Sequence, residues 1–276
     1  MSALSVAFSP CPNDTFVFHA WTHGLIPGAP DTAVTFADVD VTNHAAERGE
    51  FDIVKVSYAA LPWLLKDYRL LPCGGALGRG CGPLVLINST RTDLDGARVA
   101  VPGDRTTAYL LMRLWSAGQK PASVEVVPFA EIMPGVRDGR FDAGLVIHEA
   151  RFTYHNYGLT ALADLGEWWE SSTGNAIPLG AILARRDAGR AELDPELLIS
   201  TIRASVDHAW AHPQDSAEFV AKHADEMDPS VQQQHIDLYV NSFTRDLGEQ
   251  GYAAVEELLG RAADAGLVPR VDSIRD

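Results

Sequence analysis

The residue best suited to acid–base chemistry is His148, which ends an apolar run in the segment GLVIHEARFTY at residues 144–154. Imidazole has an ordinary pKa near neutrality, so a histidine at a cleft can exchange a proton during a reaction. A histidine that ends an apolar run fits a buried structural role equally well. The pattern HEAR is not the zinc-binding HExxH, and no nearby residue supplies further ligands at a helical spacing. His148 is therefore either a catalytic base or a structural histidine, and no metal site is expected.

Hydroxyl and amide side chains follow several expected strands, where a ligand could reach them. Ser57 stands at the carboxyl end of one apolar strand, and Asn43 occupies the corresponding position after another. Thr106 and Thr107 precede an expected helix, whose first backbone amides could receive an anion. Each of these side chains could instead cap a helix. The residues alone leave both roles open.

Two loop segments also carry reactive or flexible residues. The turn SPCPNDTF at residues 9–16 can cap the helix that follows or contact a ligand. Cys11 within it has no histidine beside it in the sequence, so we expect a small buried residue rather than a nucleophile. The run GGALGRGCGP at residues 74–83 lacks the glycine spacing of a Rossmann or P-loop motif. We expect it to form a loop near a hinge.

Alternating short apolar runs and helical stretches must position these residues. We expect strands at residues 4–8, 34–39, 52–56, 97–101, 124–127, 142–147 and 179–185. Helices are expected at residues 15–21, 42–48, 107–117, 130–138, 195–211, 214–223, 230–242 and 248–265. Such alternation predicts an α/β protein with parallel sheets and a helical C-terminal third.

The order of these elements predicts two lobes. The larger lobe comprises residues 1–86 and 185–276, with the C-terminal helices covering it, and the smaller α/β lobe comprises residues 87–184. Ligands of α/β proteins bind beyond the carboxyl ends of the strands. The active-site cleft is therefore expected between the lobes.

Composition restricts the classes of partner. The chain has 276 residues and a formal net charge of −15, with no basic run able to neutralise a phosphate backbone, so nucleic acid is not an expected partner. No apolar segment approaches the roughly 18 residues that span a bilayer, and the first residues lack a basic leader. We expect a cytoplasmic protein with no membrane insertion, and free thiols at Cys11, Cys73 and Cys81. The oligomeric state is left open.

Several motifs together resemble the 1,4-dihydroxy-6-naphthoate synthase family of the futalosine route to menaquinone. They occur in that family's order and extend over nearly the whole chain. The motifs are SPCPNDTF (9–16), KVSYAA (55–60), GGALGRG (74–80), VPG (101–103), TTAY (106–109), IHEARFTY (147–154), PLGAILAR (178–185) and YVN (239–241).

This resemblance implies a two-lobed, periplasmic-binding-protein-like (type II) fold used as a cytoplasmic enzyme. The implied reaction is that of a carbon–carbon lyase, which converts cyclic dehypoxanthine futalosine, a small-molecule carboxylate, to 1,4-dihydroxy-6-naphthoate without a cofactor. His148 matches the family's proposed general base. Ser57 and Thr107 match pocket donors, and the remaining residues expected to line the pocket are Asn43, Thr106 and Tyr154.

Two other functions are compatible with the same fold. Chorismate dehydratase shares the fold and the pathway, but the SPCPNDT opening and the IHE segment favour the naphthoate synthase. A non-catalytic protein that binds small anions is the second alternative, because a fold alone does not imply catalysis. Such a protein would have no need of a base at the strand end.

Overall fold

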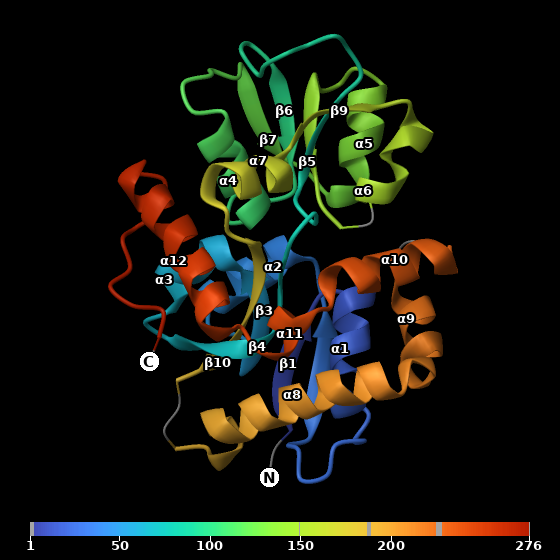
Figure 1. Cartoon of the computed structure of the whole chain (residues 1–276), viewed down its shortest axis with the longest axis vertical. Coiled ribbons are helices and arrows are strands. Elements are labelled where there is room, and N and C mark those ends of the chain that lie inside the picture. Colours follow the sequence, from blue (N-terminus) through green and yellow to red (C-terminus); the bar gives the residue numbers. More distant parts are fainter. Residues whose placement is uncertain (1–2, 149, 187–188, 225–227, 276) are drawn as a thin grey trace.

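The computed structural model describes residues 3–148, 150–186, 189–224 and 228–275, which form two five-stranded sheets with helices (Figure 1). The first sheet has the order β2-β1-β3-β10-β4. Its strands are β1 (Leu4–Phe8), β2 (Thr32–Phe36), β3 (Ile53–Ser57), β4 (Tyr68–Gly78) and β10 (Ile177–Arg185). The second sheet has the order β7-β6-β8-β5-β9. Its strands are β5 (Leu84–Ile87), β6 (Arg98–Val101), β7 (Ser123–Val126), β8 (Ala143–Val146) and β9 (Thr160–Asp164).

The strands of the two alternating units pair in parallel, as predicted, but each sheet also contains antiparallel pairs that the alternation did not predict. Strands β1, β2 and β3 pair in parallel, as do β6, β7 and β8. Strand β10 is antiparallel to β3 and β4, and β5 is antiparallel to β8 and β9. Parallel strands that follow one another in the same sheet need a crossover connection, usually a helix. Strands β5 and β10 instead enter their sheet from the other sheet, so they can pair in the antiparallel direction.

The chain passes between the sheets twice, as the order of elements predicts. Residues 79–83 lead from β4 to β5, and α7 (Leu165–Thr173) is followed by β10. The backbones meet closely at these crossings: a Cβ added to Gly82 would lie 2.1 Å from the amide nitrogen of Gly166. Glycine is required there because any side chain would separate the two segments. The lobe boundaries given above remain a prediction.

The C-terminal helices form a layer on the first sheet (Figure 1). Helices α8 (Pro195–Ala211), α9 (Ala217–His223) and α10 (Pro229–Tyr239) pack on α1 (Pro12–Thr22), while α12 (Gly248–Asp264) packs on β10. Helix α8 starts at a proline, and the Asp194 side chain caps it by accepting a bond from the Glu196 amide. Its buried stripe of Leu198, Ile202 and Val206 faces the core, where each side chain contributes about 1.5–3 kcal/mol relative to exposure.

The remaining helices are short or flank the second sheet. They are α2 (Val39–Glu47), α3 (Leu61–Leu64), α4 (Thr107–Trp115), α5 (Phe129–Arg137), α6 (Ala150–Thr153) and α11 (Ser242–Arg245). Single 3-10 turns lie at Tyr58–Ala60, Tyr154–Tyr157, Ala191–Leu193 and Pro213–Ser216. None of the helices in the described ranges is long and apolar enough to cross a bilayer.

The glycine-rich run predicted as a loop lies partly in β4, which corrects that expectation. Strand β4 extends to Gly78 because β10 pairs with it along this stretch. A Cβ added to Gly75 would lie 2.6 Å from the carbonyl oxygen of Gly180, so the missing side chain lets the two strands approach. The sequence pattern also missed β9 and α7.

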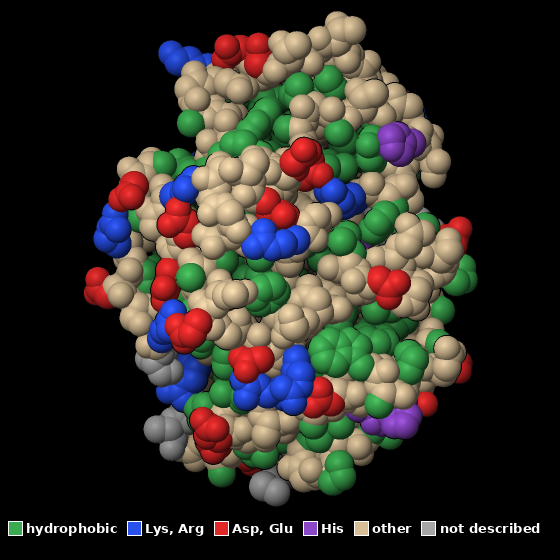
Figure 2. Space-filling view, viewed as in Figure 1, with side chains coloured by type: hydrophobic (Ala, Val, Ile, Leu, Met, Phe, Trp, Pro, Cys, Tyr) green, Lys and Arg blue, Asp and Glu red, His purple; other side chains and the backbone are tan. Residues whose placement is uncertain are grey.

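Charged side chains of both signs lie beside one another on the face shown in Figure 2. Arg203 and Asp246 are 3.2 Å apart, and Arg245 lies 2.7 Å from Asp207. Such exposed pairs add little stability, typically about 0–1 kcal/mol. Charges of both signs interspersed in this way do not form the continuous basic surface that a phosphate backbone would need.

Candidate active site

A cavity with about 680 Å³ of empty volume, its opening to solvent included, lies where the two sheets and the C-terminal layer meet. The first sheet and its helices contribute the polar residues Ser9, Asn13, Asp14, Thr42, Lys55 and Ser57. The second sheet and its connections contribute Thr106, Thr107, Ile147 and His148, while α10 contributes His235 and Tyr239. The site thus combines strand ends, as the sequence predicts, with a helix that the sequence pattern did not connect to it.

A buried ion pair joins α1 to β3 at the wall of this cavity. Lys55 Nζ pairs with Asp14 Oδ1, and both side chains are almost completely buried. The Ser9 hydroxyl donates to Asp14 Oδ2 at 2.7 Å, and Asn13 Nδ2 donates to Asp14 Oδ1 at 2.7 Å. Since a buried charge is tolerated only when it is paired and hydrogen-bonded, the network holds the start of α1 against β3. The only sequence feature that could have indicated this ion pair is the lysine within the otherwise apolar strand IVKVS.

His148 lies two residues beyond the end of β8 and is held in an uncommon backbone conformation. Its φ is 55°, and it is the one non-glycine residue with a positive φ among the described residues. This left-handed conformation is rarely adopted by side-chain-bearing residues and clusters at functional sites. The ring meets Phe129 edge-on, with centroids 5.5 Å apart. The turn thus holds His148 where it lines the cavity.

The imidazole of His148 is neutral at neutral pH. Burial lowers its pKa to about 4, because the imidazolium form loses its hydration. Asp14 opposes this effect by raising the pKa, whereas Lys55 lowers it further. A neutral imidazole retains a lone pair that can accept a proton.

Cys11 is a buried free cysteine, as expected, but it lies against this histidine although no histidine is beside it in the sequence. Its Sγ is 3.3 Å from Nδ1 of His148, although 137 residues separate the two in sequence. The contact arises because folding brings the turn before α1 against the turn after β8. No sequence spacing could have revealed it.

Ser57 and Asn43 lie together, but only Ser57 lines the cavity. The Ser57 amide donates to Asn43 Oδ1 at 2.8 Å, and Asn43 Nδ2 donates to the Ser57 hydroxyl oxygen at 3.2 Å. Asn43 is fully buried behind the serine. The structure thus gives Asn43 a supporting position, and among the described residues the Ser57 hydroxyl has no acceptor for its own hydrogen.

Thr106 and Thr107 both border the cavity at the start of α4, but their hydroxyl groups already have partners. The Thr106 oxygen caps the helix by accepting from the Tyr109 amide at 3.2 Å. The Thr107 hydroxyl donates to the Leu179 carbonyl at 2.8 Å and accepts from the Ala59 amide at 3.2 Å, which joins α4 to the first sheet. The helix end therefore offers its first backbone amides to a ligand, with the positive end of the helix dipole.

Tyr154 is a second predicted pocket residue, besides Asn43, that does not line the cavity. It begins the 3-10 turn Tyr154–Tyr157, packs against the core of the second sheet and contacts His155 with ring centroids 3.8 Å apart. It is not among the described residues that line the cavity.

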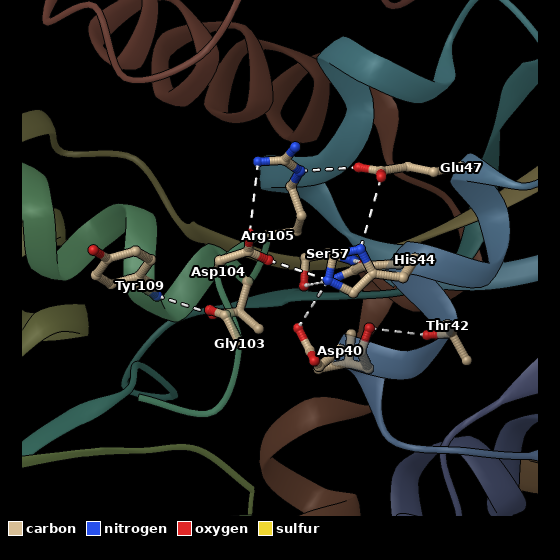
Figure 3. Close-up of polar contacts among 12 residues, drawn as sticks. Asp40, Thr42, His44, Glu47, Ser57, Gly103, Asp104, Arg105 and Tyr109 are labelled. Carbon is tan, nitrogen blue, oxygen red and sulfur yellow. Dashed lines mark hydrogen bonds and ion pairs between the residues drawn. The ribbon is translucent and has the colours of Figure 1, made fainter. Parts of the chain in front are cut away.

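A polar cluster connects the two sheets beside the cavity. His44 of α2 lies 3.2 Å from Asp104 and 3.7 Å from Asp40 and Glu47, as Figure 3 shows. Arg105 donates to Glu47 at 2.9 Å. The ligand-type atoms of Asp40, His44 and Asp104 lie within 4.8 Å of one another. Burial raises the pKa of Asp40, and Asp104 raises it further against the opposing effect of His44. These contacts tie α2 to the loop that precedes α4.

The sequence matches a known family over most of its length. The profile of the menaquinone biosynthesis family matches residues 4–264. The chain is 62% identical over 269 residues to the 1,4-dihydroxy-6-naphthoate synthase of Streptomyces coelicolor, covering 96% of this chain and 95% of the relative. It is 45% identical over 267 residues to the enzyme of the same name from Thermus thermophilus, covering 97% and 96%.

Comparison with solved structures shows the fold. Protein AF1704 from Archaeoglobus fulgidus is 33% identical with a TM-score of 0.89, covering 96% of this chain and 98% of that one. A Candida albicans protein described as having the generic periplasmic binding protein fold is 12% identical with a TM-score of 0.70, covering 99% and 93%. The fold is thus that of the type II periplasmic binding proteins. The chain belongs to the menaquinone biosynthesis family, in which it groups with the 1,4-dihydroxy-6-naphthoate synthases, and it is an enzyme.

Proposed function

We propose that this enzyme converts cyclic dehypoxanthine futalosine to 1,4-dihydroxy-6-naphthoate, with His148 as the general base. The observation that carries the proposal is a neutral imidazole, held by a left-handed turn at the wall of a cavity that also contains anion-binding amides. The residues around the cavity have three roles. They bind the small carboxylate substrate, they orient His148, and they limit the access of water to the substrate.

The substrate carboxylate is bound at the start of α4. The first amides of this nine-residue helix and the Ser57 hydroxyl are the donors that border the cavity there. Amides at a helix start favour an anion through both hydrogen bonding and the helix dipole. Thr107 positions these amides by joining α4 to β10 and to the 3-10 turn after β3. The two sheets then act as two lobes that enclose the substrate.

Cys11 is placed to support the tautomer of His148 that can act as a base. A neutral imidazole carries one hydrogen, so Nε2 has a free lone pair only when Nδ1 bears the hydrogen. Cys11 Sγ, at 3.3 Å, accepts the Nδ1 hydrogen in that tautomer. Once Nε2 takes a proton, the polarisable sulfur also stabilises the imidazolium that forms.

The chemistry requires proton movement without a redox partner. His148 removes a proton from the substrate, and the resulting electron pair drives retro-aldol or elimination-type cleavage of a carbon–carbon bond. The small sugar-derived fragment departs, and the second ring becomes aromatic, which makes the step favourable. The proton on His148 returns to one of the two products, so atoms and electrons balance between substrate and products.

The test compares turnover by the parent enzyme, His148→Ala and the control His155→Ala. His155 is an exposed residue in the same connection. Each protein is incubated with the cyclic futalosine derivative and, separately, with chorismate. The expected result is naphthoate formation by the parent and His155→Ala, with a loss of at least about 100-fold in kcat for His148→Ala. Full turnover by folded His148→Ala would refute the base assignment. Binding without turnover by the parent would indicate a solute-binding protein, and turnover of chorismate would indicate the dehydratase.

A further inference from the structure

His235 is a second imidazole at the cavity, and it plays no part in the mechanism above. It comes from α10 in the C-terminal layer, is 1% exposed, and lines the cavity. Its ring centroid lies 6.4 Å from that of His148, so one substrate segment can reach both rings. Tyr239, one helical turn further along α10, packs on its other side with centroids 4.4 Å apart.

The polar network of the cavity wall determines the tautomer of His235. Asn13 donates through Nδ2 to Asp14, which is held in turn by Lys55, so the Asn13 oxygen is directed away from the carboxylate. His235 Nε2 lies 2.9 Å from that oxygen. An amide oxygen can only accept, so Nε2 carries the ring hydrogen. Nδ1 is therefore a bare lone pair.

This lone pair is buried and has no hydrogen-bond partner among the residues that the structure describes. Buried polar atoms are nearly always partnered, and a native exception needs an explanation such as a ligand group. Burial lowers the pKa of His235 well below its ordinary value, and His148 and Lys55 lower it further, so the ring is neutral. A neutral Nδ1 can accept only from an O–H or N–H group. A carboxylate cannot satisfy it.

We propose that Nδ1 of His235 accepts a hydrogen bond from a hydroxyl group of the substrate and so selects for its hydroxylated part. The inference rests on the proposed function, because it places the same substrate in the same cavity. It assigns the two imidazoles different tasks, with His148 accepting a proton and His235 orienting the segment from which that proton leaves. The C-terminal layer thereby contributes directly to substrate recognition.

Two substitutions separate this role from a structural one. His235→Gln keeps an amide donor near the position of Nε2 for Asn13 but places no acceptor at the position of Nδ1. His235→Asn does the reverse, because its short amide reaches only the position of Nδ1. His212→Gln, at an exposed position of the same layer, is the control for the substitution itself.

Steady-state kinetics with the cyclic futalosine derivative and thermal melts of all four proteins provide the test. We expect His235→Gln to lower kcat/KM about 10-fold, mainly through KM, with an unchanged Tm. His235→Asn should retain more of the kcat/KM despite losing the bond to Asn13. Parent kinetics in a folded His235→Gln would overturn the proposal. Equal losses in both variants, or a His235→Gln protein that melts early or does not fold, would assign a structural role and overturn it too. Absence of turnover by the parent would refute the proposed function instead.

Discussion

The low pKa of His148 makes a quantitative prediction about the pH dependence of kcat/KM. The base acts only when neutral, so activity must fall as the pH drops through its pKa. With a pKa of about 4, His148 is about 90% neutral at pH 5.0, whereas a histidine with the ordinary value of 6.5 would be about 3% neutral. The two cases differ about 30-fold in the activity retained at pH 5.0.

The assay measures kcat/KM for naphthoate formation between pH 4.5 and 7.5. The substrate carboxylate stays mostly ionised over this range, so its own titration lies below the informative window. We expect a nearly flat profile down to pH 5. A half-maximal point between pH 6 and 7 would refute the reasoning, because it would mean that desolvation does not lower the pKa of His148.

A stability control must accompany this profile. His148 and His235 both have lowered pKa values in the folded protein. Below about pH 6.5 the unfolded chain therefore binds protons that the folded chain does not, and stability falls as the pH decreases. Circular dichroism at each pH shows whether a loss of activity precedes unfolding. A loss that coincides with unfolding says nothing about the base.

Two further predictions concern residues around the base. Cys11→Ala should lower kcat about 3- to 10-fold with little change in KM, because the sulfur no longer supports the tautomer of His148 that acts as a base. Cys11→Ser should restore most of the lost kcat, because a hydroxyl oxygen also accepts from Nδ1. Equal kcat values in the parent and both variants would contradict this role. Gly103→Ala places a Cβ 2.1 Å from Asp40 Oδ1, so we expect a destabilisation of about 1–3 kcal/mol and a raised KM as the loop leaves α2. The control is Gly260→Ala, whose added Cβ meets nothing within 4 Å in the described structure and should leave Tm unchanged or raise it. If the two glycine variants have the same Tm and KM, the predicted clash between residue 103 and Asp40 is wrong.

Local sequence signals determined several elements almost to the residue. The expected helix at 195–211 coincides with α8, because a capping aspartate and a proline specify its start and its apolar stripe has helical spacing. The expected strand at 4–8 coincides with β1, and the two passages between the sheets follow from the order of elements. These features depend on neighbours within a few positions, so the chain specifies them by itself.

The direction of β5 and β10 and the place of the glycine-rich run in β4 depended on pairing between distant segments. Strand β10 pairs with β3 and β4, whose paired residues lie 99 to 131 positions earlier in the sequence. A run of glycines has no side-chain pattern that distinguishes a strand from a loop. Only the approach of the neighbouring strand decides between the two, and that approach is a property of the folded sheet.

Some features of the candidate site could likewise be predicted from the sequence, and others depend on the tertiary structure. The sequence by itself predicted His148, Ser57 and the start of α4 as candidate positions for chemistry, since each lies at or just beyond the end of an expected strand. The tertiary structure alone brought Cys11 to His148 and His235 to Asn13, across 137 and 222 residues. It also made His148 neutral, because burial sets that charge state and burial depends on packing between both sheets and the C-terminal layer.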